Sequence, residues 1–100
     1  MRIMLTGKDV AVTEQLRAYA EYRMFTSIAR YEPLVRAVNV TLRRHTDHQD
    51  RFLCLVSLDL SPSGQITTRA SAPHPNVAID RVADRVASLL GQRVPRHVSS

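Results

Sequence analysis

The segment Thr13–Tyr31, TEQLRAYAEYRMFTSIARY, has the periodicity of an amphipathic α-helix. Apolar side chains recur every four residues along it, at Leu16, Ala20, Met24 and Ile28, so they line one side of the predicted helix. At about 1.5 Å per residue this helix is roughly 25 Å long, which is enough to cover a small sheet. We therefore expect one side of it to pack on a core.

The ends and the polar side of this helix carry further signals. Thr13 can act as the N-cap by accepting hydrogen bonds from free backbone N–H groups, and Arg30 suits the negative C-terminal turn. Pro33 is expected to end the helix. Arg23 and Arg30 are seven residues apart and project from the same side, with Arg17 about a third of a turn away. The helix thus offers positive charge on a side that the core does not use.

Four other segments alternate between apolar and polar residues, as half-buried β-strands do. The predicted strands are Arg2–Thr6, Val35–Arg44, Arg51–Leu60 and Gln65–Ala70. The first strand, the helix and the second strand form a βαβ unit, so these two strands should run parallel with a right-handed crossover. The last three strands form an antiparallel meander, with a tight turn at Pro62 and Gly64.

A second amphipathic helix is expected to open near Pro75, whose missing N–H has no partner in a first turn, and to end between Gly91 and Pro95. Its predicted buried stripe is Ile79, Val82, Val86, Leu89 and Leu90. The order β-α-β-β-β-α predicts an α+β fold, with one four-stranded mixed sheet and both helices packed on one face. Residues 1–93 form a single predicted domain, and residues 94–100 a polar C-terminal tail.

The charge of the chain points to a polyanionic partner. Its 100 residues carry fourteen Lys and Arg against nine Asp and Glu, a formal net charge of +5, and thirteen of the cations are Arg. Arg presents a planar fork that matches phosphate oxygens, whereas Lys is a point charge. A general bias toward Arg in the composition remains an alternative, because net charge alone describes only non-specific association.

Targeting signals are absent from the sequence. The first ten residues have no apolar signal-peptide region, and no apolar run approaches the ~18 residues of a membrane span. The single cysteine, Cys54, cannot form an intramolecular disulfide and favours a reducing compartment. We expect a cytoplasmic protein with no membrane partner.

The sequence contains no recognisable catalytic motif. His45, Asp47, His48 and Asp50 could bind Zn²⁺, but a solvated loop is the favoured interpretation because rigid ligand elements are missing. Cys54 faces the predicted core and is expected to be a small buried hydrophobe. No glycine-rich phosphate loop or paired carboxylate site occurs. We therefore expect no catalytic residue, metal, cofactor or small-molecule substrate.

The arginines of the two helices differ in their sequence neighbours. On the second helix, Asp84 could form a surface ion pair with Arg81, which leaves phosphate contact and solvation equally open for Arg81 and Arg85. The cations of the first helix have only Glu14 and Glu21 nearby. Phosphate contact is therefore the favoured role on the first helix.

Four segments together resemble the family of ribosome hibernation promoting factors and ribosome-associated inhibitors, also known as sigma-54 modulation proteins. These segments are TGKDVAVTEQLRAYAE from Thr6, IARYEPLVRAVNVTL from Ile28, CLVSLDL from Cys54 and AIDRVADRV from Ala78. The resemblance runs from Ile3 to about Leu90 and implies a β-α-β-β-β-α fold related to double-stranded RNA-binding domains. This chain stops after the first domain, so it resembles the short, divergent type.

The resemblance also implies a function. Members bind the small ribosomal subunit in the channel for mRNA and tRNA, contact its ribosomal RNA with basic residues of both helices, and block translation during stress. Lys8, Arg23, Arg30 and Arg85 fall where the family is usually basic. The full candidate set for RNA binding is Lys8, Arg17, Arg23, Arg30, Arg81, Arg85 and Arg93.

The second helix departs from the family at Ser88, Gly91 and Gln92, where typical members continue with Lys or Arg. Two alternatives therefore stay open: a module for structured RNA that is not specific to ribosomes, and a protein-interaction domain that has lost RNA binding. Leu53 and Leu55 on the wet face of the sheet also suggest an apolar patch that a homodimer could cover.

Overall fold

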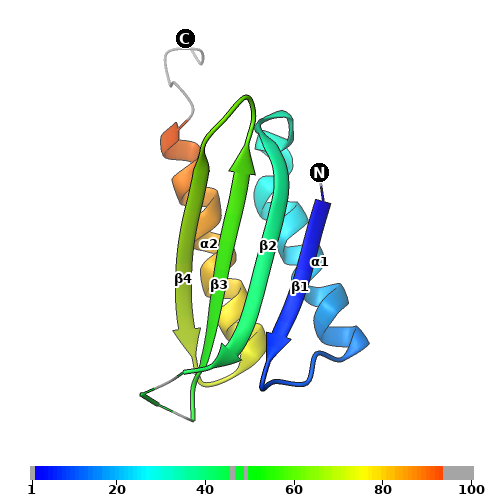
Figure 1. Ribbon diagram of the computed structural model, residues 1–100, viewed down its shortest axis with the longest axis vertical. Coiled ribbons are helices and arrows are strands. Elements are labelled where there is room, and N and C mark those ends of the chain that lie inside the picture. The colour runs from blue at the N-terminus through cyan, green and yellow to red at the C-terminus, as the bar shows by residue number, and fades with distance from the viewer. Residues whose placement is uncertain (1, 46, 49, 94–100) are drawn as a thin grey trace.

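The computed structural model describes residues 2–45, 47–48 and 50–93, which form one sheet with two helices on one of its faces (Figure 1). The elements in chain order are β1 (Arg2–Lys8), α1 (Glu14–Ile28), the 3₁₀ helix η1 (Ala29–Leu34), β2 (Val35–Arg44), β3 (Phe52–Leu60), β4 (Gln65–Ala72) and α2 (Pro75–Arg93). The predicted α+β architecture is thereby confirmed.

The sheet has the strand order β1-β2-β3-β4. β1 pairs parallel with β2, with Leu5 opposite Val40, because α1 carries the chain back across the sheet between them. β3 pairs antiparallel with both β2 and β4. The parallel pair and the meander therefore follow the predicted pattern, and β1 and β4 are the two edge strands.

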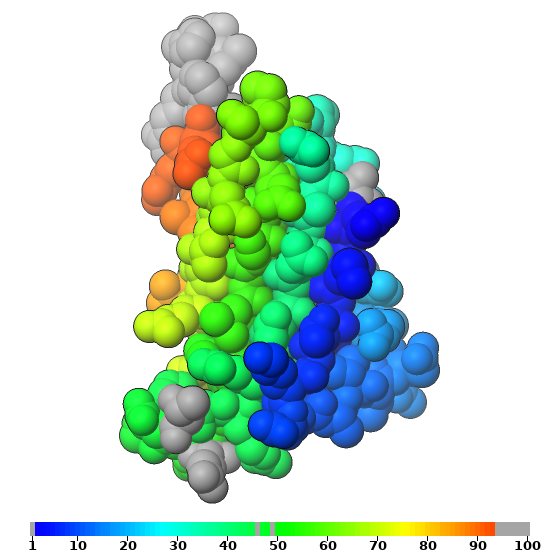
Figure 2. Space-filling view, in the orientation of Figure 1, coloured from blue at the N-terminus to red at the C-terminus, as the bar shows by residue number. Residues whose placement is uncertain are grey.

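The core lies between the sheet and the two helices. Ala20, Met24 and Ile28 of α1 are fully buried, and they pack against the apolar face of the strands. The buried side chains of α2 are Ala78, Ile79, Val82, Ala83, Val86 and Leu90. No polar or charged residue of the described chain is buried. Figure 2 looks onto the opposite face of the sheet, which no helix covers.

The first helix is shorter than predicted. Thr13 is its N-cap, with the side-chain oxygen accepting from the Leu16 N–H at 3.1 Å. The α-helix ends at Ile28, and the chain continues as a 3₁₀ helix in which Pro33 lies inside the element and does not terminate it. Arg30 therefore belongs to η1, so its predicted place in the last turn of α1 was wrong. Short 3₁₀ segments are frequent at the C-terminal ends of α-helices, and this one leaves the apolar period of α1 before it unchanged.

Two strands extend beyond their predicted ends. Lys8 is the last residue of β1, because the strand continues through Gly7, and β4 reaches Ala72. α2 reaches Arg93, which lies between Gly91 and Pro95 as predicted, and Gly91 is inside the helix. A Cβ at Gly91 would lie 3.3 Å from the Tyr31 hydroxyl, so this glycine allows η1 to approach α2 closely. Pro95 and the predicted polar tail, residues 94–100, lie outside the described residues.

Candidate nucleic-acid interface

The two helices lie side by side behind the sheet and start at the same end of the domain (Figure 1). Their apolar stripes face the sheet, so their polar sides form the opposite surface of the molecule. This helical surface is where the sequence places six of the seven candidate cations. Its usefulness for binding a polyanion depends on which of those cations are free of internal partners.

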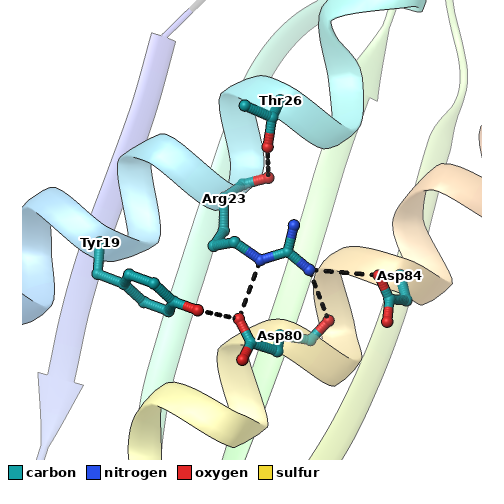
Figure 3. Close-up of polar contacts among 5 residues, drawn as sticks. All are labelled: Tyr19, Arg23, Thr26, Asp80 and Asp84. Atoms are coloured by element: carbon teal, nitrogen blue, oxygen red, sulfur yellow. Dashed lines mark hydrogen bonds and ion pairs between the residues drawn. The ribbon is translucent and has the colours of Figure 1, made fainter.

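Arg23 is not free, because α2 supplies two carboxylates to it (Figure 3). Its Nε donates to Oδ1 of Asp80 at 2.9 Å, and its Nη2 donates to Oδ1 of Asp84 at 3.3 Å. Nη2 also lies 3.4 Å from the Asp80 carbonyl oxygen, and the Tyr19 hydroxyl donates to Oδ1 of Asp80. The expectation that Arg23 has few acids near it was wrong, since Asp80 and Asp84 come from the neighbouring helix. Contact between Arg23 and RNA phosphate stays a prediction.

These four residues, Tyr19, Arg23, Asp80 and Asp84, form an interhelical clamp. The Arg23 side chain is 25% exposed, so burial alone would lower its pKa, but the bonds to Asp80 and Asp84 outweigh this effect and raise the pKa. The hydrogen bond to Asp80 raises the pKa of Tyr19 above its ordinary value. Both raised pKa values favour the protonated forms of Tyr19 and Arg23, which are the forms that donate the hydrogen bonds. The clamp therefore fixes α1 against α2 and is a structural feature.

Two more candidate arginines have internal partners. Nη1 of Arg17 donates to the Leu5 carbonyl oxygen at 3.1 Å, which joins α1 to β1. Nη1 of Arg81 donates to the Ser71 carbonyl oxygen at 2.9 Å, which joins α2 to β4. The Arg81–Asp84 surface ion pair that the sequence left open is not formed among the described residues, because Asp84 pairs with Arg23 and Arg81 points to the sheet edge.

Arg30, Arg85 and Arg93 are exposed, and within residues 2–45, 47–48 and 50–93 they make no hydrogen bond or ion pair. η1 and the end of α2 lie together, since the Tyr31 hydroxyl packs at Gly91, so Arg30 and Arg93 are carried by neighbouring elements at one end of the domain. We name Arg30, Arg85 and Arg93 the free helical arginines. They are the part of the predicted set that remains available on this surface.

Lys8 does not belong to the helical surface. It pairs in register with Arg43 at the end of β1, and strand alternation from the buried Leu5 puts it on the uncovered face of the sheet. The same alternation places Arg43 and Arg69 on that face. The candidate set from the sequence did not include Arg43 or Arg69. The alternation of apolar and polar residues in their strands could have placed both on the polar face of the sheet.

Ser88, Gly91 and Gln92 stand where typical family members have Lys or Arg, and the structure gives these three positions different environments. Ser88 and Gln92 are exposed, so they are positions where a cation could stand. Gly91 packs against Tyr31 and is a packing position. One of the three substitutions is therefore explained by the contact between η1 and α2.

The residues considered for chemistry are placed as follows. Cys54 is buried, and burial raises the pKa of its thiol to about 12, so it stays protonated and unreactive at neutral pH. The ring centroids of His45 and His48 are 5.2 Å apart, and Nδ1 of His45 accepts from the Asp47 N–H. The described residues contain no group of three His, Cys, Asp or Glu side chains placed to hold a metal ion.

Neither α1 nor α2 combines the length and the apolar character that a membrane span requires.

Comparison with known proteins gives a family and a fold. The family described as "Sigma 54 modulation protein / S30EA ribosomal protein" matches residues 3–94. The N-terminal domain of Protein Y from Thermus thermophilus superposes with a TM-score of 0.79 at 23% sequence identity, covering 94% of this chain and 100% of that chain. A ribosomal subunit interface protein from Coxiella burnetii superposes with a TM-score of 0.80 at 16% identity, covering 93% of this chain and 97% of that chain. Among curated proteins, none matches the sequence significantly.

Proposed function

The chain belongs to the sigma 54 modulation protein / S30EA ribosomal protein family of ribosome hibernation factors, and we propose on this premise that it binds the small ribosomal subunit and inhibits translation. The proposed role is non-enzymatic: the domain occupies the channel for mRNA and tRNA and acts by steric occlusion in the cytoplasm. The names of the structural relatives, one of them a ribosomal subunit interface protein, support a ribosomal partner.

The observation that carries this proposal is the contrast between paired and free arginines on the helical surface. The clamp around Arg23 holds the two helices together, and the free helical arginines Arg30, Arg85 and Arg93 have no internal acceptor among the described residues. Guanidinium groups on a rigid support bind phosphate oxygens with little ordering cost. Such contacts supply affinity for ribosomal RNA without reading base identity, and the shape of the RNA supplies the location.

Co-sedimentation with purified small subunits tests this function. Arg30→Gln combined with Arg85→Gln should weaken binding at least about tenfold, because two charge-assisted contacts are lost. A matched control is Arg36→Gln combined with Arg2→Gln, which removes the same charge from two exposed residues that line a depression elsewhere, at the N-terminal ends of β1 and β2. Equal binding by the helix variant and the wild-type protein would reject the helical surface as the contact site.

A protein-interaction role is a second candidate, favoured by two aromatic side chains on α1. Tyr22 is 64% exposed and Phe25 is 50% exposed, and they are three residues apart on the helix. Exposed aromatic residues are frequent anchors of protein interfaces. If Tyr22→Ser with Phe25→Ser abolishes subunit binding while the arginine variants retain it, the contact is to a ribosomal protein and this second role holds.

A further inference from the structure

A depression of about 420 Å³ lies where β2, β3 and β4 meet the side of α2. Three arginines line it, each from a different element: Arg43 from β2, Arg69 from β4 and Arg85 from α2. We name it the arginine pocket. Its lining residues come from β2, β3, β4, α2 and the residues after β2, and none of them belongs to the Arg23 clamp.

Strand register explains why these side chains converge. Arg43 is opposite Leu53 on β3, and Leu53 is opposite Ser71 on β4. Arg69 lies two residues before Ser71 on the same face of the edge strand. Leu53 is only 7% exposed, so it forms a floor beneath the longer side chains. The apolar patch that Leu53 and Leu55 suggested for a homodimer is therefore largely covered at Leu53.

The charges of the pocket are uncompensated. Arg43, Arg69 and Arg85 make no hydrogen bond or ion pair within the described part of the chain, and Nε of Arg43 is buried without an acceptor there. Asp47 is the single carboxylate among the lining residues, and His45 is the other titratable group. Asp59 lies at the far end of β3 and accepts from Gln65 Nε2 at 3.2 Å. Three guanidinium groups thus face one carboxylate.

We propose that the arginine pocket is a binding site for the phosphate group of a nucleotide. Phosphate oxygens suit this set because each arginine can present a two-pronged donor to them, and three forks can share one tetrahedral group. The phosphate comes either from an RNA backbone or from the terminus of a free nucleotide. The site deepens the proposed function, on which it rests for the choice of a nucleotide, and it adds a contact at the β4 edge that includes no residue of the Arg23 clamp.

Binding is measured on the isolated protein by NMR titration at constant ionic strength with four probes: inorganic phosphate, ADP, a six-nucleotide RNA without a terminal phosphate, and a hexaglutamate peptide. We expect saturable shifts at the arginine side chains of the pocket and at the Ser71 amide. Arg43→Gln and Arg69→Gln should each weaken binding about tenfold or more, and Arg69→Lys should weaken it less, because the charge remains and the fork is lost. Arg36→Gln is the charge-matched control on β2 and should stay within about twofold of wild type.

The probes distinguish the source of the phosphate. Saturation by the RNA identifies the backbone phosphodiester as the ligand, and saturation by ADP and phosphate alone identifies a terminal phosphate; both results support the site. Equal weakening in Arg36→Gln and Arg43→Gln would overturn it, since the binding would then be non-specific attraction. Saturation by a hexaglutamate peptide with no binding of phosphate would also overturn it, in favour of an acidic protein partner.

Sedimentation with small subunits separates this proposal from the proposed function. A wild-type protein that binds phosphate but does not co-sediment contradicts the ribosomal role and leaves the pocket intact. A wild-type protein that co-sediments, but whose pocket variants bind phosphate as tightly as it does, contradicts the pocket alone. The amide spectrum of each variant shows whether it is folded, and Arg69→Lys keeps the test informative if a glutamine variant is not.

Discussion

At the scale of single residues, the role of an arginine in this protein depends on where its nearest acceptor lies. Arg23, Arg17 and Arg81 have similar exposed-helix contexts in the sequence, and each is bonded to a group from another element. Arg30 and Arg85 have no such partner within the described residues. The local sequence cannot separate these two classes, because every acceptor is more than nine residues away along the chain.

Arg23→Gln is expected to lower the free energy of unfolding by about 1–2 kcal/mol. It removes the donor shared by Asp80 and Asp84, and the effect is limited because Asp84 is 81% exposed and solvent screens that half of the clamp. Urea denaturation measures the change. Arg30→Gln is the control and should stay within about 0.5 kcal/mol of wild type. If both variants lose the same stability, the clamp does not have the structural role described above.

Cys54 should make stability fall as the pH rises above 9. Burial raises the thiol pKa from its ordinary 9.0 to about 12 in the folded protein, so the protonated thiol stabilises the fold fully below pH 9. This contribution is lost between pH 9 and about 12, at up to about 1.4 kcal/mol per pH unit, because only the unfolded chain ionises there. Tyr19, whose pKa is also raised, adds a loss of the same sign at higher pH. Urea unfolding at several alkaline pH values should show a shallower decline for Cys54→Ala than for wild type.

At the scale of elements, the contact between η1 and α2 explains a glycine in the last turn of α2. Gly91 lies within α2, where alanine would be favoured by up to about 1 kcal/mol. The Tyr31 hydroxyl stands 3.3 Å from the position of the missing Cβ, which is a tight but movable neighbour. Helix propensity and close packing therefore oppose each other at this position.

A double-mutant cycle separates these two effects. Gly91→Ala alone should change the free energy of unfolding little, because the gain in propensity is offset by crowding against Tyr31. In a Tyr31→Phe background the same substitution should stabilise the protein by about 0.5–1 kcal/mol. Urea denaturation of the four proteins gives the coupling energy. An identical effect of Gly91→Ala in both backgrounds would show that Tyr31 does not restrict this position.

The elements themselves could be predicted from the sequence, whereas their ends and contacts could not. Alternation in β2 and β3 and the four-residue repeat in α1 report which face meets the core, and this is a local property. The change from α1 to η1, the extension of β1 to Lys8 and the place of Gly91 depend on packing between elements. The internal partners of the candidate site residues could not be predicted either, since Asp80 and Asp84 reach Arg23 across the helix interface.

At the scale of the whole molecule, cations stand on both sides of the sheet. The free helical arginines lie on α2 and η1, while Lys8, Arg43 and Arg69 lie on the uncovered face. Arg85 contributes to both groups, because it projects beside the edge strand. The domain can therefore meet a folded RNA along its helices and around its β4 edge.

The salt dependence of subunit binding should report how many of these cations are used. If the three free helical arginines alone meet phosphates, affinity should fall by roughly 40-fold between 50 and 200 mM salt. If the sheet-face cations take part and about six phosphates are contacted, the fall should be roughly a thousandfold. Sedimentation at several salt concentrations gives the slope. No fall at all would exclude phosphate contacts as the source of affinity.

The hydrogen bond from Arg81 to the Ser71 carbonyl has a consequence for self-association. β4 is an edge strand, and an unoccupied edge can accept a strand from a second copy and begin aggregation. A guanidinium group on a backbone acceptor of that edge competes with such pairing and adds positive charge where two copies would meet. Arg81→Ala should therefore raise light scattering during mild heating more than Arg36→Ala does. Equal scattering by the two variants would show that Arg81 does not protect the β4 edge from pairing with a second copy.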